Sequence, residues 1–218
     1  MNHIDQTSVL ITQRIAGRYF TGEPVWEFGT GLSYSTFSCT WQDAAADAVS
    51  SSWILRPTPS EPGSGFLGRF STEQLANAEG MAYTVVVKNT GKIAGDYVAL
   101  AFVSPPNATT TASDHTAIAP QKQLFGFGRV SLAPSAEATI DFLLEMGAAR
   151  GDRLAERRAG NDQAAAAGLG GIRWSSASVD AHGRRSVLPG EYRLTVTDST
   201  EPRWFEATGR AQMVQAAL

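Results

Sequence analysis

Apolar and polar residues alternate along most of the chain, and this alternation predicts short β-strands. In the stretch FSCTW, Phe37, Cys39 and Trp41 alternate with polar residues, the period of two that is typical of a half-buried strand. Comparable patterns predict further strands in residues 81–89, 96–103, 122–132, 137–144, 172–179, 191–196 and around 204–205. Turn residues separate these stretches and almost no helical period occurs, so the pattern predicts an all-β sandwich.

The stretch DYVALAFV, residues 96–103, is apolar on both faces. Alternate residues from Val98 to Phe102 fall on one side, and the small or branched residues between them fall on the other. This pattern predicts a strand that is covered on both sides. In residues 191–196, by contrast, Tyr192 and Val196 share a single apolar face.

Three regions lack a strand pattern. Residues 16–36 form an extended, turn-rich segment, because glycines and a proline interrupt any helical period. Residues 43–70, rich in Ala, Ser, Pro and Gly, and residues 147–171, which are compositionally biased, are interpreted as loop insertions.

Composition and charge remove several classes of protein. The chain of 218 residues has 43% hydrophobic and 18% charged residues, which is typical of a folded globular protein. Its 18 basic residues form no stripe, so we expect no nucleic-acid partner. No apolar run approaches the roughly 20 residues needed to span a bilayer, and the N-terminus lacks the pattern of a secretory signal. Cys39, the single cysteine, is interpreted as a small buried hydrophobe.

Residues with catalytic potential form no convincing constellation. Ser33 in GLSYS has a weak likeness to a nucleophile elbow, but Ser35 replaces the closing glycine and no strand–turn–helix pattern surrounds it. The three histidines, His3, His115 and His182, lack ligand spacing, and a triad at Asp114-His115 has no supporting pattern. The acidic residues do not form a distinct pair of the kind that glycosidases use (Glu137, Asp141, Glu145 and Asp152). We therefore predict no catalytic residue, metal or cofactor in this chain.

Tryptophans leave a second function open. Trp41 and Trp174 lie in strand patterns and are expected in the core, whereas Trp26 and Trp204 could stack on sugars. The alternative function is thus a freestanding β-sandwich module that binds polysaccharide or a protein partner. The triplet at Asn107 is a potential N-glycosylation site.

Four motifs together resemble glycoside hydrolase family 3. Residues 17–37, GRYFTGEPVWEFGTGLSYSTF, resemble the segment that joins the second catalytic-half domain of that family to its C-terminal module. VVVKNTGKIAGDYVALAFV, PQKQLFGFGRVSLAP and LPGEYRLTV resemble stretches of the fibronectin type III-like module, in the same order. The resemblance covers residues 16–198 and departs from the family at Ser135, where the family usually has glycine.

The resemblance implies an immunoglobulin-like, fibronectin type III-like β-sandwich over residues 36–218. Residues 1–35 would be a short stub of an α/β sandwich domain followed by an interdomain linker. The nucleophile and the acid/base of the family belong to domains outside this chain. The implied parent is a secreted β-xylosidase or β-glucosidase that hydrolyses terminal β-xylosyl or β-glucosyl residues, with a slight preference for the β-xylosidase branch, and the module would stabilise its catalytic domains.

The residues that the resemblance assigns to interdomain packing lie in and beside the linker (Trp26, Phe28, Gly29, Gly31, Leu32, Tyr34 and Phe37). Without the catalytic domains, apolar side chains such as Trp26, Phe28 and Leu32 should be partly exposed, which is typical of an interface. The expected partners are therefore these catalytic domains and, as an alternative, polysaccharide.

Overall fold

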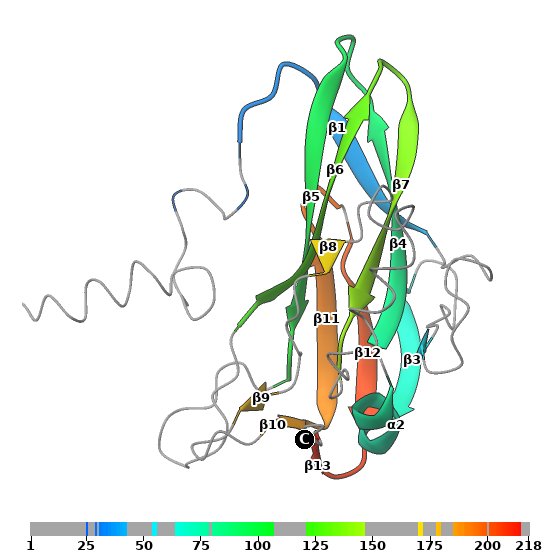
Figure 1. Cartoon of the computed structure of the whole chain (residues 1–218), viewed down its shortest axis with the longest axis vertical. Coiled ribbons are helices and arrows are strands. Elements are labelled where there is room, and N and C mark those ends of the chain that lie inside the picture. Colours follow the sequence, from blue (N-terminus) through cyan, green and yellow to red (C-terminus); the bar gives the residue numbers. More distant parts are fainter. Residues whose placement is uncertain are drawn as a thin grey trace, which may run out of the picture.

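The computed structural model of the chain describes residues 25, 29, 31–42, 54–55, 64–78, 80–106, 121–146, 170–171, 178–179, 185–199 and 201–214. Strands dominate this part of the chain (Figure 1). The strands are β1 (Phe37–Gln42), β2 (Ile54–Leu55), β3 (Phe66–Ser71), β4 (Gly80–Asn89), β5 (Gly95–Ser104), β6 (Gln123–Leu132), β7 (Glu137–Leu144), β8 (Gly170–Gly171), β9 (Ser178–Val179), β10 (Arg185–Val187), β11 (Gly190–Val196), β12 (Arg203–Thr208) and β13 (Gln212–Met213). One helix, α2 (Thr72–Asn77), is described with them.

Two sheets form the sandwich. In the first, β4 pairs with β1, β2 and β7; in the second, the order is β3-β12-β11-β5-β6-β8. A small third sheet, β13-β10-β9, lies at one end beside α2 (Figure 1). Strands β1, β4 and β7 facing β12, β11, β5 and β6 form the two-layer arrangement of immunoglobulin-like sandwiches, which confirms the predicted fold class.

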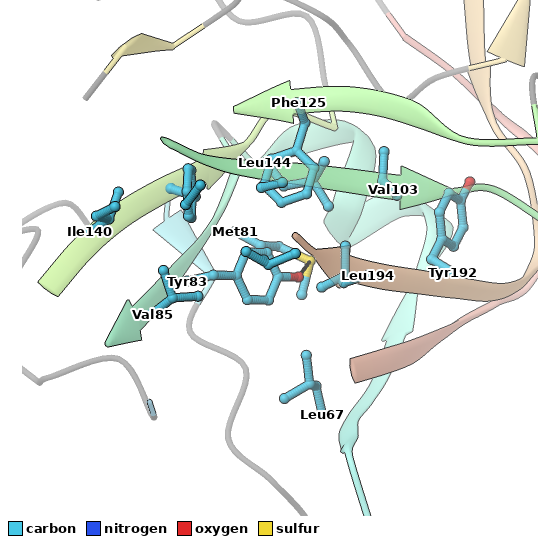
Figure 2. Close-up of a cluster of buried hydrophobic side chains, with 14 of the residues drawn as sticks. Leu67, Met81, Tyr83, Val85, Val103, Phe125, Ile140, Leu144, Tyr192 and Leu194 are labelled. Atoms are coloured by element: carbon cyan, nitrogen blue, oxygen red, sulfur yellow. Dashed lines mark hydrogen bonds between the residues drawn. The ribbon is translucent and has the colours of Figure 1, made fainter. Parts of the chain in front are cut away.

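The core lies between the two sheets, where the predicted apolar faces meet (Figure 2). Tyr83 of β4 packs edge to face on Phe125 of β6, with ring centroids 6.2 Å apart, and Phe125 packs in the same way on Phe142 of β7. A Cβ atom at Gly126 would lie 2.6 Å from Cδ1 of Phe142. The glycines of the FGFG stretch therefore make room for large side chains of the opposite sheet.

A tyrosine corner closes the backbone at the start of β11. The Tyr192 hydroxyl donates to the carbonyl oxygen of Leu188 at 3.0 Å and accepts from the Leu188 amide at 3.2 Å. Its buried ring stacks on Phe205, with centroids 4.9 Å apart. A corner of this kind is a hallmark of the immunoglobulin-like sandwich.

The structure departs from the sequence prediction in the region assigned to the first insertion. Residues 66–71 are not loop but strand β3, which pairs in parallel with β12. Helix α2 follows directly, and a capping box between Ser71 and Gln74 fixes its start. A helix of six residues is too short to show a helical period, which explains why the pattern did not indicate it.

Several predictions lie outside the described residues. They concern the α/β stub before residue 25, residues 147–169 of the second insertion, and residues 172–177 of a predicted strand, of which 178–179 form β9. In the described part of the chain, no helix is long and apolar enough to cross a membrane.

Candidate functional site

The linker meets the sandwich at the end opposite to α2, beside the β4–β5 and β6–β7 loops (Figure 1). Phe37, the first residue of β1, pairs with Asn89, the last residue of β4. The Phe37 ring packs on Tyr97 with centroids 5.0 Å apart. The amides of Thr90 and Gly91 donate to the carbonyl oxygen of Thr36 at 2.8 and 3.1 Å. The C-terminal end of the linker is thus part of the sandwich.

Asn89 is the centre of this junction. Its side chain is fully buried, and all four of its hydrogen-bonding positions are occupied. Oδ1 accepts from the Ser35 hydroxyl at 2.7 Å and from the Gly91 amide at 3.0 Å. Nδ2 donates to the carbonyl oxygens of Ile93 at 2.8 Å and Leu132 at 3.1 Å. One amide group therefore joins the linker, the β4–β5 loop and the end of β6.

The backbone of the junction completes the same network. The Asn89 amide donates to the Ala136 carbonyl oxygen at 2.9 Å, and the Ser135 amide donates to that of Asn89 at 3.0 Å. A Cβ atom at Gly91 would lie 2.2 Å from Oγ of Ser35. Glycine at this position is consequently required by the close approach of the linker.

The two serines of GLSYS have structural roles. Ser33 is exposed, and its Oγ accepts a hydrogen bond from the Ser35 amide at 3.2 Å, a local turn contact. Ser35 is buried and donates to Asn89. Ser33 thus makes a local turn contact, and Ser35, which the sequence pattern marked only as the residue in place of the closing glycine, has the anchoring role.

Apolar residues of the linker are exposed to solvent. Leu32 has a relative exposure of 103% and Tyr34 of 98%, so Leu32 is more exposed than the partial exposure predicted for it. Gly29 has φ +93°, and a Cβ atom there would lie 2.6 Å from Cδ1 of Leu100 on β5, so the linker also touches the outer face of the sandwich. At Gly31, no heavy atom of the described residues lies within 4 Å of where a Cβ atom would be. Trp26 and Phe28, the other two residues assigned to the packing motif, lie outside the described residues.

Trp204, the candidate sugar-binding tryptophan that the structure describes, packs within the fold. Trp204 is partly buried, and its ring lies against Phe66 with centroids 4.4 Å apart. Trp41 packs against the core, and its indole nitrogen donates to the Glu201 carbonyl oxygen at 2.9 Å. Trp26, Trp174 and Asn107 lie outside the described residues.

Of the acidic candidates, Glu137 and Asp141 lie on β7, and Glu145 follows its last residue. Glu137 lies 4.0 Å from Lys88 on the exposed surface, and Asp141 accepts from the Thr84 hydroxyl at 2.6 Å. Asp152, Asp114 and all three histidines lie outside the described ranges. Within those ranges, no group of three His, Cys, Asp or Glu residues is placed to hold a metal ion.

The shifted pKa values do not favour acid–base chemistry near neutral pH. Burial, and secondarily the charge of Asp198, raises the pKa of the Cys39 thiol to about 12. Burial also raises the pKa of Tyr97, whose hydroxyl donates to the Thr197 carbonyl oxygen at 2.8 Å. Hydrogen bonds from Ser131 and Arg129 lower the pKa of Asp96. Each shift stabilises the form that the group already has at pH 7.

The chain is similar to part of several fungal xylosidases and glucosidases. The probable exo-1,4-β-xylosidase xlnD of Aspergillus fumigatus is 30% identical over 201 residues, which are 90% of this chain and 20% of that protein. The probable β-glucosidase G of Aspergillus flavus is 34% identical over 130 residues, 58% of this chain and 14% of that protein. The chain therefore spans about a fifth or less of the length of these relatives. No protein-family model matches it.

Solved structures share the fold. A GH3 exo-β-xylosidase, solved in complex with a xylobiose aziridine probe, superposes with a TM-score of 0.54 at 22% identity. The match covers 89% of this chain and 20% of that enzyme. The similarity supports a common sandwich fold for the matched part.

Proposed function

Because the chain is a homologue of the C-terminal part of the glycoside hydrolase family 3 xylosidases and glucosidases, we propose that it serves as the fibronectin type III-like, non-catalytic module of such an enzyme. The module packs against the catalytic domains and stabilises them. The whole enzyme hydrolyses terminal β-xylosyl or β-glucosyl residues, and β-xylosyl is favoured because the relative that matches 90% of the chain carries that name.

This proposal rests on one observation: the linker is bound to the sandwich through some of its residues, while neighbouring apolar side chains of the linker are exposed. Ser35 is buried against Asn89, whereas Leu32 and Tyr34 are exposed only a few residues away. Exposed apolar groups on an anchored segment are typical of an interface. Gly31 supports the same view, because nothing in the described part of the chain occupies the space beside it.

The first test concerns catalysis by the chain alone. The purified chain is assayed with aryl β-xylosides and aryl β-glucosides, and no turnover above a buffer control is expected. Hydrolysis that a single carboxylate substitution within this chain abolishes would overturn the non-catalytic role.

The second test concerns stabilisation. The chain is fused to the catalytic part of the Aspergillus fumigatus xylosidase in place of the region that it matches. The fusion should retain xyloside turnover after heating that inactivates the same enzyme lacking this region. A fusion that carries the Leu32→Asp/Tyr34→Asp double substitution should lose this added heat resistance, because it places charges in the contact between the linker and the catalytic part. A fusion that carries Met213→Asp should keep the added heat resistance, because Met213 is an exposed apolar residue at the opposite end of the sandwich. A fusion no more heat-resistant than the truncated enzyme contradicts the proposal.

A further inference from the structure

The outer face of β5 and β6 carries exposed apolar side chains. Val98 and Phe127 are 43% and 44% exposed, although the inner residues of β5, Ala99 and Ala101, are fully buried. The sequence of β5 is apolar on both faces, a pattern typical of a strand covered on both sides. The prediction that β5 is covered on both sides is therefore wrong at Val98 for this chain.

Ion pairs occur on several outward faces of the sandwich, and on the β5–β6 face Arg129, the cross-strand partner of Val98, pairs with Asp96. On the β3-β12-β11 side, Arg69 lies 2.6 Å from Glu206, and Arg193 lies 3.3 Å from Glu191. On the β4–β7 side, Lys88 faces Glu137. Among the described residues, the exposed large apolar side chains other than Met213 lie in the linker, the β4–β5 loop and the β5–β6 face (Val25, Leu32, Tyr34, Ile93, Val98 and Phe127). Among the described residues, exposed apolar side chains are thus concentrated in the linker, at the linker end of the sandwich and on the β5–β6 face.

This face is continuous with the linker. Gly29 approaches Leu100 so closely that a Cβ atom would lie 2.6 Å from Cδ1 of Leu100. Phe127 is the cross-strand partner of Leu100, and directly paired residues have Cβ atoms about 5 Å apart. In the relatives, four fifths of the polypeptide lies outside the matched part. A domain attached through the linker is therefore held at high effective concentration beside Phe127.

We propose that Val98, Leu100 and Phe127 form a docking surface for the catalytic part of the same enzyme, which continues the contact made by Leu32 and Tyr34. This inference rests on the proposed function and extends it to a second surface. Arg129 and Ser131 both donate to the carboxylate of Asp96 beside the apolar residues, and this ordered group supplies the polar rim that protein interfaces typically have. The occupant is a protein surface with complementary apolar groups.

Hydroxyl-radical footprinting tests the surface. The labelling of Phe127 is compared between the chain alone and its fusion to the catalytic part of the Aspergillus fumigatus xylosidase. We expect Phe127 and Tyr34 to be labelled at least fivefold more slowly in the fusion, and Met213 to be unchanged. Protection of Tyr34 without protection of Phe127 overturns this inference and leaves the proposed function standing. Protection of neither residue counts against both.

A matched pair of variants tests the same surface through stability. Phe127→Glu in the fusion should remove a measurable part of its heat resistance. Thr139→Glu, which adds the same charge at an exposed position on β7, should not. Two results identify another occupant and overturn the inference. One is concentration-dependent dimerisation of the chain alone that Phe127→Glu abolishes. The other is slow labelling of Phe127 in the monomeric chain, which indicates cover by the chain itself.

Discussion

The two ends of the sandwich each close with one buried polar side chain, but the two side chains work over very different distances along the sequence. At the end near α2, Tyr192 bonds to Leu188, four residues away. At the linker end, Asn89 bonds to Ser35, 54 residues before it, and to Leu132, 43 residues after it. The corner at Tyr192 joins residues of one short segment of the chain, whereas the Asn89 network exists only when three distant segments have come together.

The difference indicates how the linker is positioned. The direction in which the linker leaves the sandwich depends on a tertiary network of hydrogen bonds. In this network, each buried polar group needs another group as its hydrogen-bond partner. A change at Asn89 should therefore affect the whole junction, and a change at Tyr192 should remain local.

The largest expected effect is that of Asn89→Ala. The substitution removes four hydrogen bonds and leaves the Ile93 and Leu132 carbonyl oxygens without their side-chain donor. Since each buried unsatisfied group costs about 1–3 kcal/mol, the free energy of unfolding should fall by about 3 kcal/mol or more. Urea unfolding measures the change. Asn77→Ala, at an exposed asparagine of α2, is the control and should change it by less than about 0.5 kcal/mol.

Hydrogen exchange shows whether the loss is concentrated at the linker end. The Thr90 and Gly91 amides, which donate to Thr36, should exchange faster in Asn89→Ala than the amides of β11. Equal acceleration throughout the sandwich would show that Asn89 has no special role at the junction.

A smaller effect is expected for Tyr192→Phe. The ring and its stacking on Phe205 remain, and only the hydroxyl contacts with Leu188 are lost. Removing such hydrogen bonds should lower the free energy of unfolding by about 1–1.5 kcal/mol. Tyr34→Phe, at an exposed tyrosine, should have no measurable effect on unfolding in urea. If Tyr192→Phe costs as much as Asn89→Ala, the contrast between a local and a tertiary corner fails.

The same contrast explains how far the sequence could predict this molecule. Alternation indicated the buried faces of β1, β7 and β11, because burial on one side imposes a period of two. Asn-Thr-Gly at residues 89–91 is a sequence typical of a turn, but nothing in it indicates that Asn89 would bind Ser35, since that contact depends on the tertiary approach of the linker. GLSYS attracted attention for Ser33, and the structure gives the anchoring role to Ser35.

The sequence pattern did not predict strand β3, for a related reason. Its partner β12 lies more than 130 residues further along the chain, and the pairing is parallel. Gly65 and Gly68 in and beside the strand obscure any alternation. The Ser71–Gln74 capping box was the one local signal for α2.

Ser135→Gly should raise the free energy of unfolding, whereas Asn89→Ala and Tyr192→Phe should lower it. Ser135 lies in the β6–β7 turn with φ 64°, and its amide donates to the Asn89 carbonyl oxygen. Because this left-handed conformation costs a non-glycine residue about 1 kcal/mol, glycine should raise the free energy of unfolding by up to about 1 kcal/mol. Ala133→Gly in the same turn, where φ is not positive, should lower it. Thermal unfolding of the two variants decides whether the backbone conformation limits stability at this end.

The smallest effect on the isolated chain is expected for Leu32→Asp, although the residue lies within a few positions of Ser35. Leu32 is fully exposed, so the change should shift the free energy of unfolding by less than about 0.5 kcal/mol. In the fusion with the catalytic part, the same substitution should lower the unfolding temperature, because a charge would enter the contact. Differential scanning calorimetry of both forms measures this separation. A Leu32→Asp chain that is destabilised on its own would mean that Leu32 packs within the module, and the linker would then have no free face to offer a partner.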